Sequence, residues 1–86
     1  MEMVLKNTIS MMESDSYKER FKAEYFQLSI RLQKLRDMVE KWDNGTLDFE
    51  PTCPREIYDK QLMAMSQYLD ILEQRAKIEE IELVCR

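Results

Sequence analysis

The residues best suited to binding chemistry are aromatic and basic side chains in two separate parts of the chain. Aromatic rings can stack on a nucleobase, and guanidinium or ammonium groups can hold phosphates. The candidate ligand-binding residues are Tyr17, Lys18, Lys22, Tyr68, Arg75 and Lys77. If the two parts meet, they predict a site for a phosphate-bearing ligand. The alternative is that Phe21 and Tyr68 belong to the core and that the cations are simply solvated.

Catalytic and metal-binding patterns are missing from the sequence. It has no histidine and one glycine, and therefore no Gly-rich phosphate loop and no nucleophile elbow. Cys53 precedes an expected helix, where a thiol pKa can fall, but no histidine can serve as its base. Two cysteines without histidine make no zinc site. We predict no catalytic residue, no metal and no cofactor, and hence no enzyme.

The compartment is predicted from cysteine spacing and hydropathy. Cys53 and Cys85 are 32 residues apart, which is about 48 Å if the segment between them is helical. A disulfide needs Cα atoms within about 7 Å, so reduced thiols are expected. No run approaches the roughly 20 apolar residues of a membrane span, and the N-terminus lacks a signal-peptide core. We predict a protein of the host cell cytoplasm, with no membrane partner.

Two amphipathic helices must bring the binding residues together. Apolar residues recur at alternating spacings of four and three over residues 21–42 and again over residues 58–76, which is typical of heptad seams. Ser16 with Glu19 predicts a helix start. Asn44 and Gly45 predict its end, and Pro54 suits the first turn of the second helix.

The predicted fold is all-α, an antiparallel two-helix hairpin with a short N-terminal segment. We expect a single helical domain over residues 1–86. Its parts are an N-terminal extension at 1–15, a helix at 16–43, a loop at 44–53 and a helix at 54–83. A hairpin this small encloses little core, so we expect it to assemble into a helical-bundle homo-oligomer.

Apolar residues outside the two seams predict where the copies meet. These interface candidates are Phe26, Ile30, Ile57, Ile71 and Ile78. For Phe26 and Ile30 the alternative is that residues 1–13 cover them. The first helix has seven basic and four acidic residues and the second has the reverse, which favours their pairing. The net charge of −4 would repel long duplex nucleic acid.

Several segments together carry a resemblance to a known family, and the most specific is Pro51-Thr52-Cys53-Pro54. The segments are residues 17–21, 24–25, 42–49, 51–54 and 61–79. The sequence resembles small phage and prophage proteins labelled as relatives of a crAss-like phage gene product, over about residues 17–83. The resemblance implies a viral or prophage setting, but it assigns no activity and no site residue.

Two function classes follow from these expectations. The first is a phage or prophage anti-defence protein that sequesters a nucleotide second messenger between subunits, as a sponge without catalysis. This interpretation rests on analogy with compact helical sponges that capture cyclic nucleotides. The alternative is a small interaction module that binds and inhibits a host defence protein through Phe26, Ile30 or the Met-rich N-terminus. A minor phage structural or assembly protein would need only the seams.

Overall fold

The chain forms two long helices with a short helical segment at its start. The computed structural model describes residues 4–83, in which a 3-10 helix η1 (Leu5–Thr8) and a short helix α1 (Ile9–Met12) precede α2 (Tyr17–Asp43) and α3 (Arg55–Glu79). Residues 4–83 contain no strand, which confirms the all-α prediction for this part of the chain. Cys85 lies outside the described residues. The oligomeric state stays a prediction.

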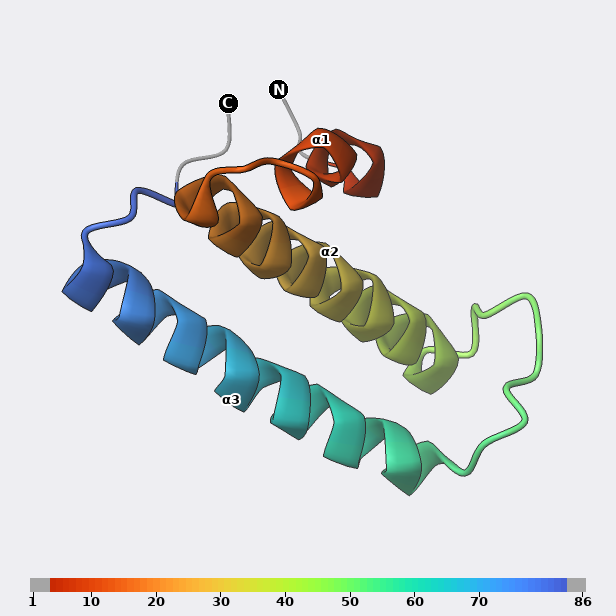
Figure 1. The fold of residues 1–86 in the computed structure, drawn as a ribbon. Coiled ribbons are helices and arrows are strands. Elements are labelled where there is room, and N and C mark those ends of the chain that lie inside the picture. Colours follow the sequence, from red (N-terminus) through yellow and green to blue (C-terminus); the bar gives the residue numbers. More distant parts are fainter. Residues whose placement is uncertain (1–3, 84–86) are drawn as a thin grey trace.

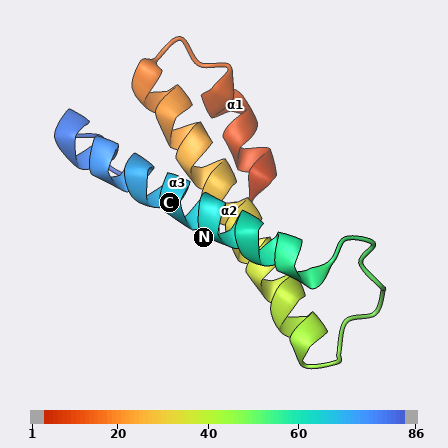
Figure 2. The same cartoon turned by 90° about the horizontal axis from the view of Figure 1, so that it is seen from below.

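Helix α2 lies in the middle of the molecule. Figure 1 shows α3 running back alongside α2, while α1 lies on another side of α2. The view from below in Figure 2 shows the same order, and the backbones of α1 and α3 do not come within 8 Å of each other between Cα atoms. The molecule is elongated, with extents of 43 × 24 × 20 Å. No helix within residues 4–83 has the length and apolar character needed to cross a membrane.

The ends of α2 are set by local side-chain and backbone chemistry. The Ser16 hydroxyl accepts a hydrogen bond from the Glu19 backbone N–H at 3.5 Å, as predicted for the residue that caps this helix. After Asp43 the chain turns at Asn44 and at Gly45, whose φ of 74° is the left-handed conformation that glycine adopts most readily. Both predicted boundaries of α2 are therefore within one residue of the observed ones.

Removing the Ser16 hydroxyl tests its capping role. We expect Ser16→Ala to lower the free energy of unfolding by about 0.5–1 kcal/mol, because one N–H group of the first turn loses its acceptor. Urea unfolding followed by circular dichroism measures the change. Ser16→Asp should restore stability, since a carboxylate also caps; equal stability of the alanine and aspartate variants would contradict the capping role.

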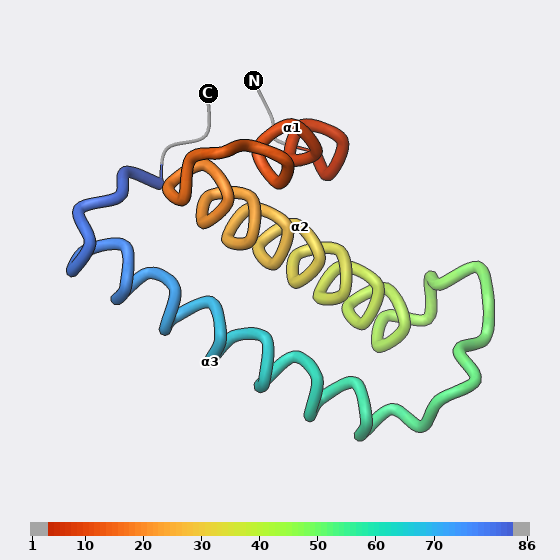
Figure 3. The backbone as a smooth tube through the Cα atoms, in the orientation of Figure 1, coloured from red at the N-terminus to blue at the C-terminus, as the bar shows by residue number. Residues whose placement is uncertain are grey.

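The end of α3 differs from the prediction, because the helix stops at Glu79 and does not continue to residue 83. Glu80 adopts a left-handed conformation, with a φ of 55°. A continued helix would carry Ile81 about 140° around the axis from Ala76. The turn instead brings Ile81 onto the core, where it is 6% exposed and packs with Phe21 and Ala76. Figure 3 shows this last segment turning towards the start of α2.

The core is a narrow seam between α2 and α3, as the spacing of apolar residues predicted. Leu32 and Leu72 are almost completely buried, with 1% and 0% of their surface exposed. At the end near the connecting loop, Trp42 and Tyr58 meet edge to face with ring centroids 5.7 Å apart. A seam of this width leaves most of the outer surface of α3 exposed.

The N-terminal segment covers a second face of α2. Thr8 is 1% exposed; its hydroxyl donates to the Leu5 carbonyl at 2.7 Å and accepts from the Gln27 amide at 2.9 Å. Phe26, one turn before Ile30, is buried, and Ile30 is half-buried. Because η1 and α1 pack on α2, the structure agrees with the alternative in which the N-terminal segment covers Phe26. An interface role for Phe26 would require this segment to move.

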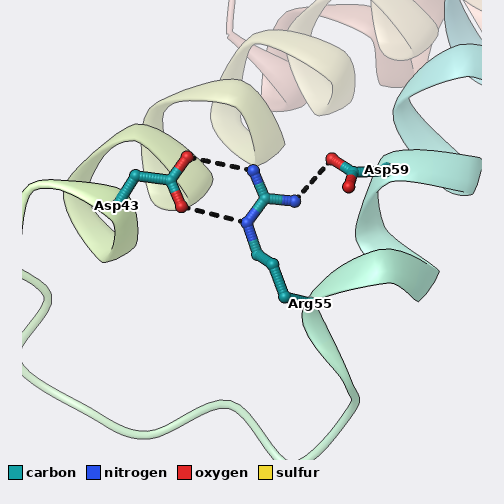
Figure 4. A network of polar contacts seen from close by, with 3 residues as sticks. All are labelled: Asp43, Arg55 and Asp59. Carbon is teal, nitrogen blue, oxygen red and sulfur yellow. Dashed lines mark hydrogen bonds and ion pairs between the residues drawn. The ribbon is translucent and has the colours of Figure 1, made fainter.

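One arginine joins the two long helices beside the loop. The Arg55 guanidinium donates two hydrogen bonds to the Asp43 carboxylate, at 3.1 and 3.0 Å, and a third to Asp59 at 2.6 Å (Figure 4). A planar guanidinium matches a carboxylate in this paired geometry. The end of α2 is thereby tied to the first turn of α3.

This contact predicts a dependence of stability on pH. The hydrogen bond from Arg55 holds the pKa of Asp43 below its ordinary value. The ionised carboxylate therefore stabilises the folded state at neutral pH, and this contribution is lost as the pH falls through the lowered pKa. We expect Asp43→Asn to lower Tm by a few degrees at pH 7 and by less at pH 2.5. Asp48→Asn, a change of the same kind in the loop, is the control. Equal loss at both pH values would contradict the ionic contribution.

Candidate ligand-binding groove

A groove runs beside the α2–α3 seam, near the start of α2. It consists of two adjoining hollows of about 370 and 300 Å³, and Arg20 and Glu24 line both of them. We call their union the α2–α3 groove. Its polar wall is one face of α2, formed by Arg20, Glu24, Gln27 and Arg31. Tyr68 and Arg75 of α3 form the facing wall, with Met12 of α1 at one edge.

The α2 wall follows from residue spacing. Arg20, Glu24, Gln27 and Arg31 recur at intervals of four, three and four, so they share one side of the helix next to the seam. The N-terminal segment orients two of them. The Arg20 guanidinium donates to the Ser14 carbonyl at 2.8 Å, and the Gln27 amide bonds Thr8. Among residues 4–83 neither Arg20 nor Arg31 forms an ion pair, so both can bind an anion.

Arg75 is held in place by two aromatic residues of α2. Its guanidinium donates to the Tyr17 hydroxyl at 2.8 Å and lies 4.9 Å from the centre of the Phe21 ring. It also contacts Glu79 at 3.4 Å. The hydrogen bond with Tyr17 raises the pKa of Arg75, and a guanidinium group is protonated in proteins in any case. The start of α2 and the end of α3 therefore present a fixed cation against an aromatic surface.

Tyr68 and Glu24 connect the two walls of the groove. The Tyr68 hydroxyl donates a hydrogen bond to the Glu24 carboxylate. Glu24 opposes the binding of an anion, but it can accept a hydrogen bond from an amino or hydroxyl group. The groove thus has three arginines and one carboxylate, with the polar groups needed to orient a ligand.

A family model named Sequestin matches residues 15–78, which is most of the chain. The chain belongs to the Sequestin family. The Sequestin match includes all of α2 and nearly all of α3, and it excludes η1 and α1. Every groove residue except Met12 lies within it. A search among curated proteins found no match, and a search among solved structures also found none. The phage setting implied by the sequence resemblance stays a proposal.

The six predicted ligand-binding residues all lie within the Sequestin match, but the structure does not bring them all to one location. Tyr17, Tyr68 and Arg75 line the α2–α3 groove. Lys22 pairs with Glu19 at 3.6 Å. Lys77 lines another hollow, beside Tyr25, Glu73 and Ile81.

Lys18, Lys22 and Lys77 do not line the α2–α3 groove with Tyr17 and Arg75. Lys18 and Lys22 are each two residues from Arg20, which is about 200° around the helix. They therefore lie across the seam from the groove. The same physical argument identifies the residues that the prediction missed, because the spacing of Arg20, Glu24, Gln27 and Arg31 is visible in the sequence.

A further hollow of about 420 Å³ lies at the loop end of the Sequestin-family chain. Its charged residues are Lys34, Asp37, Lys41 and Asp48. Two cations and two carboxylates cancel, so this hollow attracts an anion less than the α2–α3 groove does. Within residues 4–83 no group of three or more cysteine, aspartate and glutamate side chains is placed to hold a metal ion.

Proposed function

We propose that this chain sequesters a nucleotide second messenger and releases it unchanged. The observation that carries the proposal is the α2–α3 groove, where Arg20, Arg31 and Arg75 gather beside aromatic side chains. Guanidinium groups bind phosphate oxygens through paired donors, and an aromatic ring can stack on a base. The family name, Sequestin, suggests sequestration of a ligand, which is binding and not catalysis.

The dimensions of the groove favour a ligand with separated phosphates. Arg20 and Arg31 are eleven residues apart, or about 16 Å along α2. A ligand with two phosphates and a base between them matches this separation of the two Cα atoms. Each hollow is within the lower range of small-molecule sites. In this arrangement Glu24 accepts a hydrogen bond from an amino group of the base or from a ribose hydroxyl.

The proposed biological role is anti-defence in a phage or prophage. The protein would remove a host signal by stoichiometric binding in the host cytoplasm, as a homo-oligomer with ligand held between subunits. This setting is supported by the resemblance to phage proteins described above. Because no chemistry is required, the role is compatible with a chain that lacks histidine.

The alternative, inhibition of a host protein through Phe26, Ile30 or the Met-rich N-terminus, loses the first of these three surfaces. Phe26 is 6% exposed and lies beneath the N-terminal segment, so a partner cannot reach it without a rearrangement. Neither this role nor that of a minor structural protein accounts for the arginines of the groove. The experiment described next distinguishes these two roles from sequestration of a nucleotide.

Native mass spectrometry of the protein purified gently from phage-infected cells tests the proposal. We expect an oligomer that carries a stoichiometric adduct of several hundred daltons, whose fragmentation releases a nucleotide. Protein expressed in uninfected cells is the control, because it should carry less or none. An oligomer without adduct, or one bound to a host protein, would overturn the sponge proposal.

A further inference from the structure

A row of exposed apolar side chains follows the outer surface of α3. Ile57, Ala64, Ile71 and Ile78 recur every seven residues and therefore align along the helix. All four are exposed, and the three isoleucines have 43%, 54% and 81% of their surface accessible. We call this row the α3 stripe. The stripe is about 31 Å long. No element within residues 4–83 covers it.

We infer that the α3 stripe is the contact of a two-fold dimer in which α3 of a second copy lies antiparallel. A two-fold interface must be complementary to itself. With the axis between Gln67 and Tyr68, the spacing places Ile57 opposite Ile78 of the second copy and Ala64 opposite Ile71. A small residue then faces a large one at the centre, which permits close packing. Parallel pairing would place Ala64 against Ala64 and leave a gap.

The residues beside the stripe are compatible with the same axis. In an antiparallel two-fold pair, each flank of α3 lies beside the same flank of the second copy's α3. On the flank next to the groove, Arg75 faces Gln61 of the second copy, and Tyr68 faces Tyr68. On the other flank, Lys60 faces Gln74, and Gln67 faces its own copy. No like charges are opposed, which favours a second copy of this chain as the occupant.

The dimer would also complete the ligand site, and this part of the inference rests on the proposed function. Tyr68 is 42% exposed and belongs to both the groove wall and the flank of the stripe. An α3 helix docked on the stripe therefore lies along the open side of the groove. The second copy contributes its own Tyr68 near the axis and shields the arginines from water. Shielding strengthens their attraction for phosphate.

Cysteine cross-linking tests the geometry. In a chain with Cys53→Ser and Cys85→Ser, we expect no cross-linked dimer from Ala64→Cys alone or from Ile71→Cys alone. Co-expression of the two variants should give the cross-linked heterodimer under mild oxidation, because a disulfide forms only when the Cα atoms are within about 7 Å. Self-linking of Ala64→Cys would show parallel pairing, and absence of any cross-link would show no such contact; both overturn the inference.

A charged substitution separates the dimer from the proposed function. We expect Ile71→Glu to be monomeric in native mass spectrometry and to lose about tenfold or more of the nucleotide adduct when purified from phage-infected cells. Met63→Glu is the matched control, because Met63 is 65% exposed on α3 outside the stripe. A monomeric Ile71→Glu that keeps the full adduct would overturn the completion of the site but leave the sponge proposal intact. Heterodimer cross-links in a protein without any adduct would support the dimer and contradict the sponge.

Discussion

Arg75→Glu is expected to abolish the nucleotide adduct while the helices stay folded. The substitution replaces a permanent cation in the groove by a carboxylate next to the Phe21 ring and near Glu79. It also removes the donor to Tyr17. The groove changes from three cations and one anion to two cations and two anions. Its net positive charge, and with it the attraction for phosphate, is lost. Native mass spectrometry of protein from phage-infected cells measures the adduct directly.

Lys18→Glu is the matched control for Arg75→Glu, because it makes the same change of charge within the Sequestin match. From the sequence alone both substitutions are expected to abolish binding. Since Lys18 lies across the α2 seam from the groove, we now expect Lys18→Glu to keep the adduct. Circular dichroism and Tm of both variants should resemble those of the parent. A full adduct on folded Arg75→Glu would contradict the groove as the binding site.

Leu72→Ala is expected to have the largest effect on stability. Leu72 is completely buried between α2 and α3, in the cluster that contains Phe21, Ala76 and Ile81. Truncating a buried leucine lowers the free energy of unfolding by about 2–5 kcal/mol, through lost transfer energy and the cavity that remains. The whole chain is expected to have roughly 4–13 kcal/mol, so this single change removes a large part of the total.

Urea unfolding at a fixed protein concentration measures this loss, because an oligomer would make stability depend on concentration. Met63→Ala is the matched control; as an exposed side chain of α3 it should change stability by no more than about 0.5 kcal/mol. If Leu72→Ala and Met63→Ala are equally stable, the described seam is not the core of the folded protein.

The sequence by itself determined the two long helices and the apolar face that each turns towards the other. Spacing of apolar residues defined both seams, and the hydroxyl of Ser16 and the freedom of Gly45 set the ends of α2. These features are local: a helix start needs a nearby acceptor, and a seam needs a repeat of four and three. The meeting of Tyr17 with Arg75 also follows, because a chain that turns back places the start of one helix beside the end of the other.

Tertiary structure alone decided which flank of each helix carries the groove and what covers the remaining surface. Lys18 and Arg20 both carry a positive charge, but of the two only Arg20 lines the α2–α3 groove, because the direction in which α3 packs on α2 depends on contacts between distant residues. The burial of Phe26 under residues 5–12 has the same origin. Ile81 is the clearest case: its burial against Phe21 is gained only if the helix ends at Glu79, and no local signal at Glu80 favours a left-handed residue there.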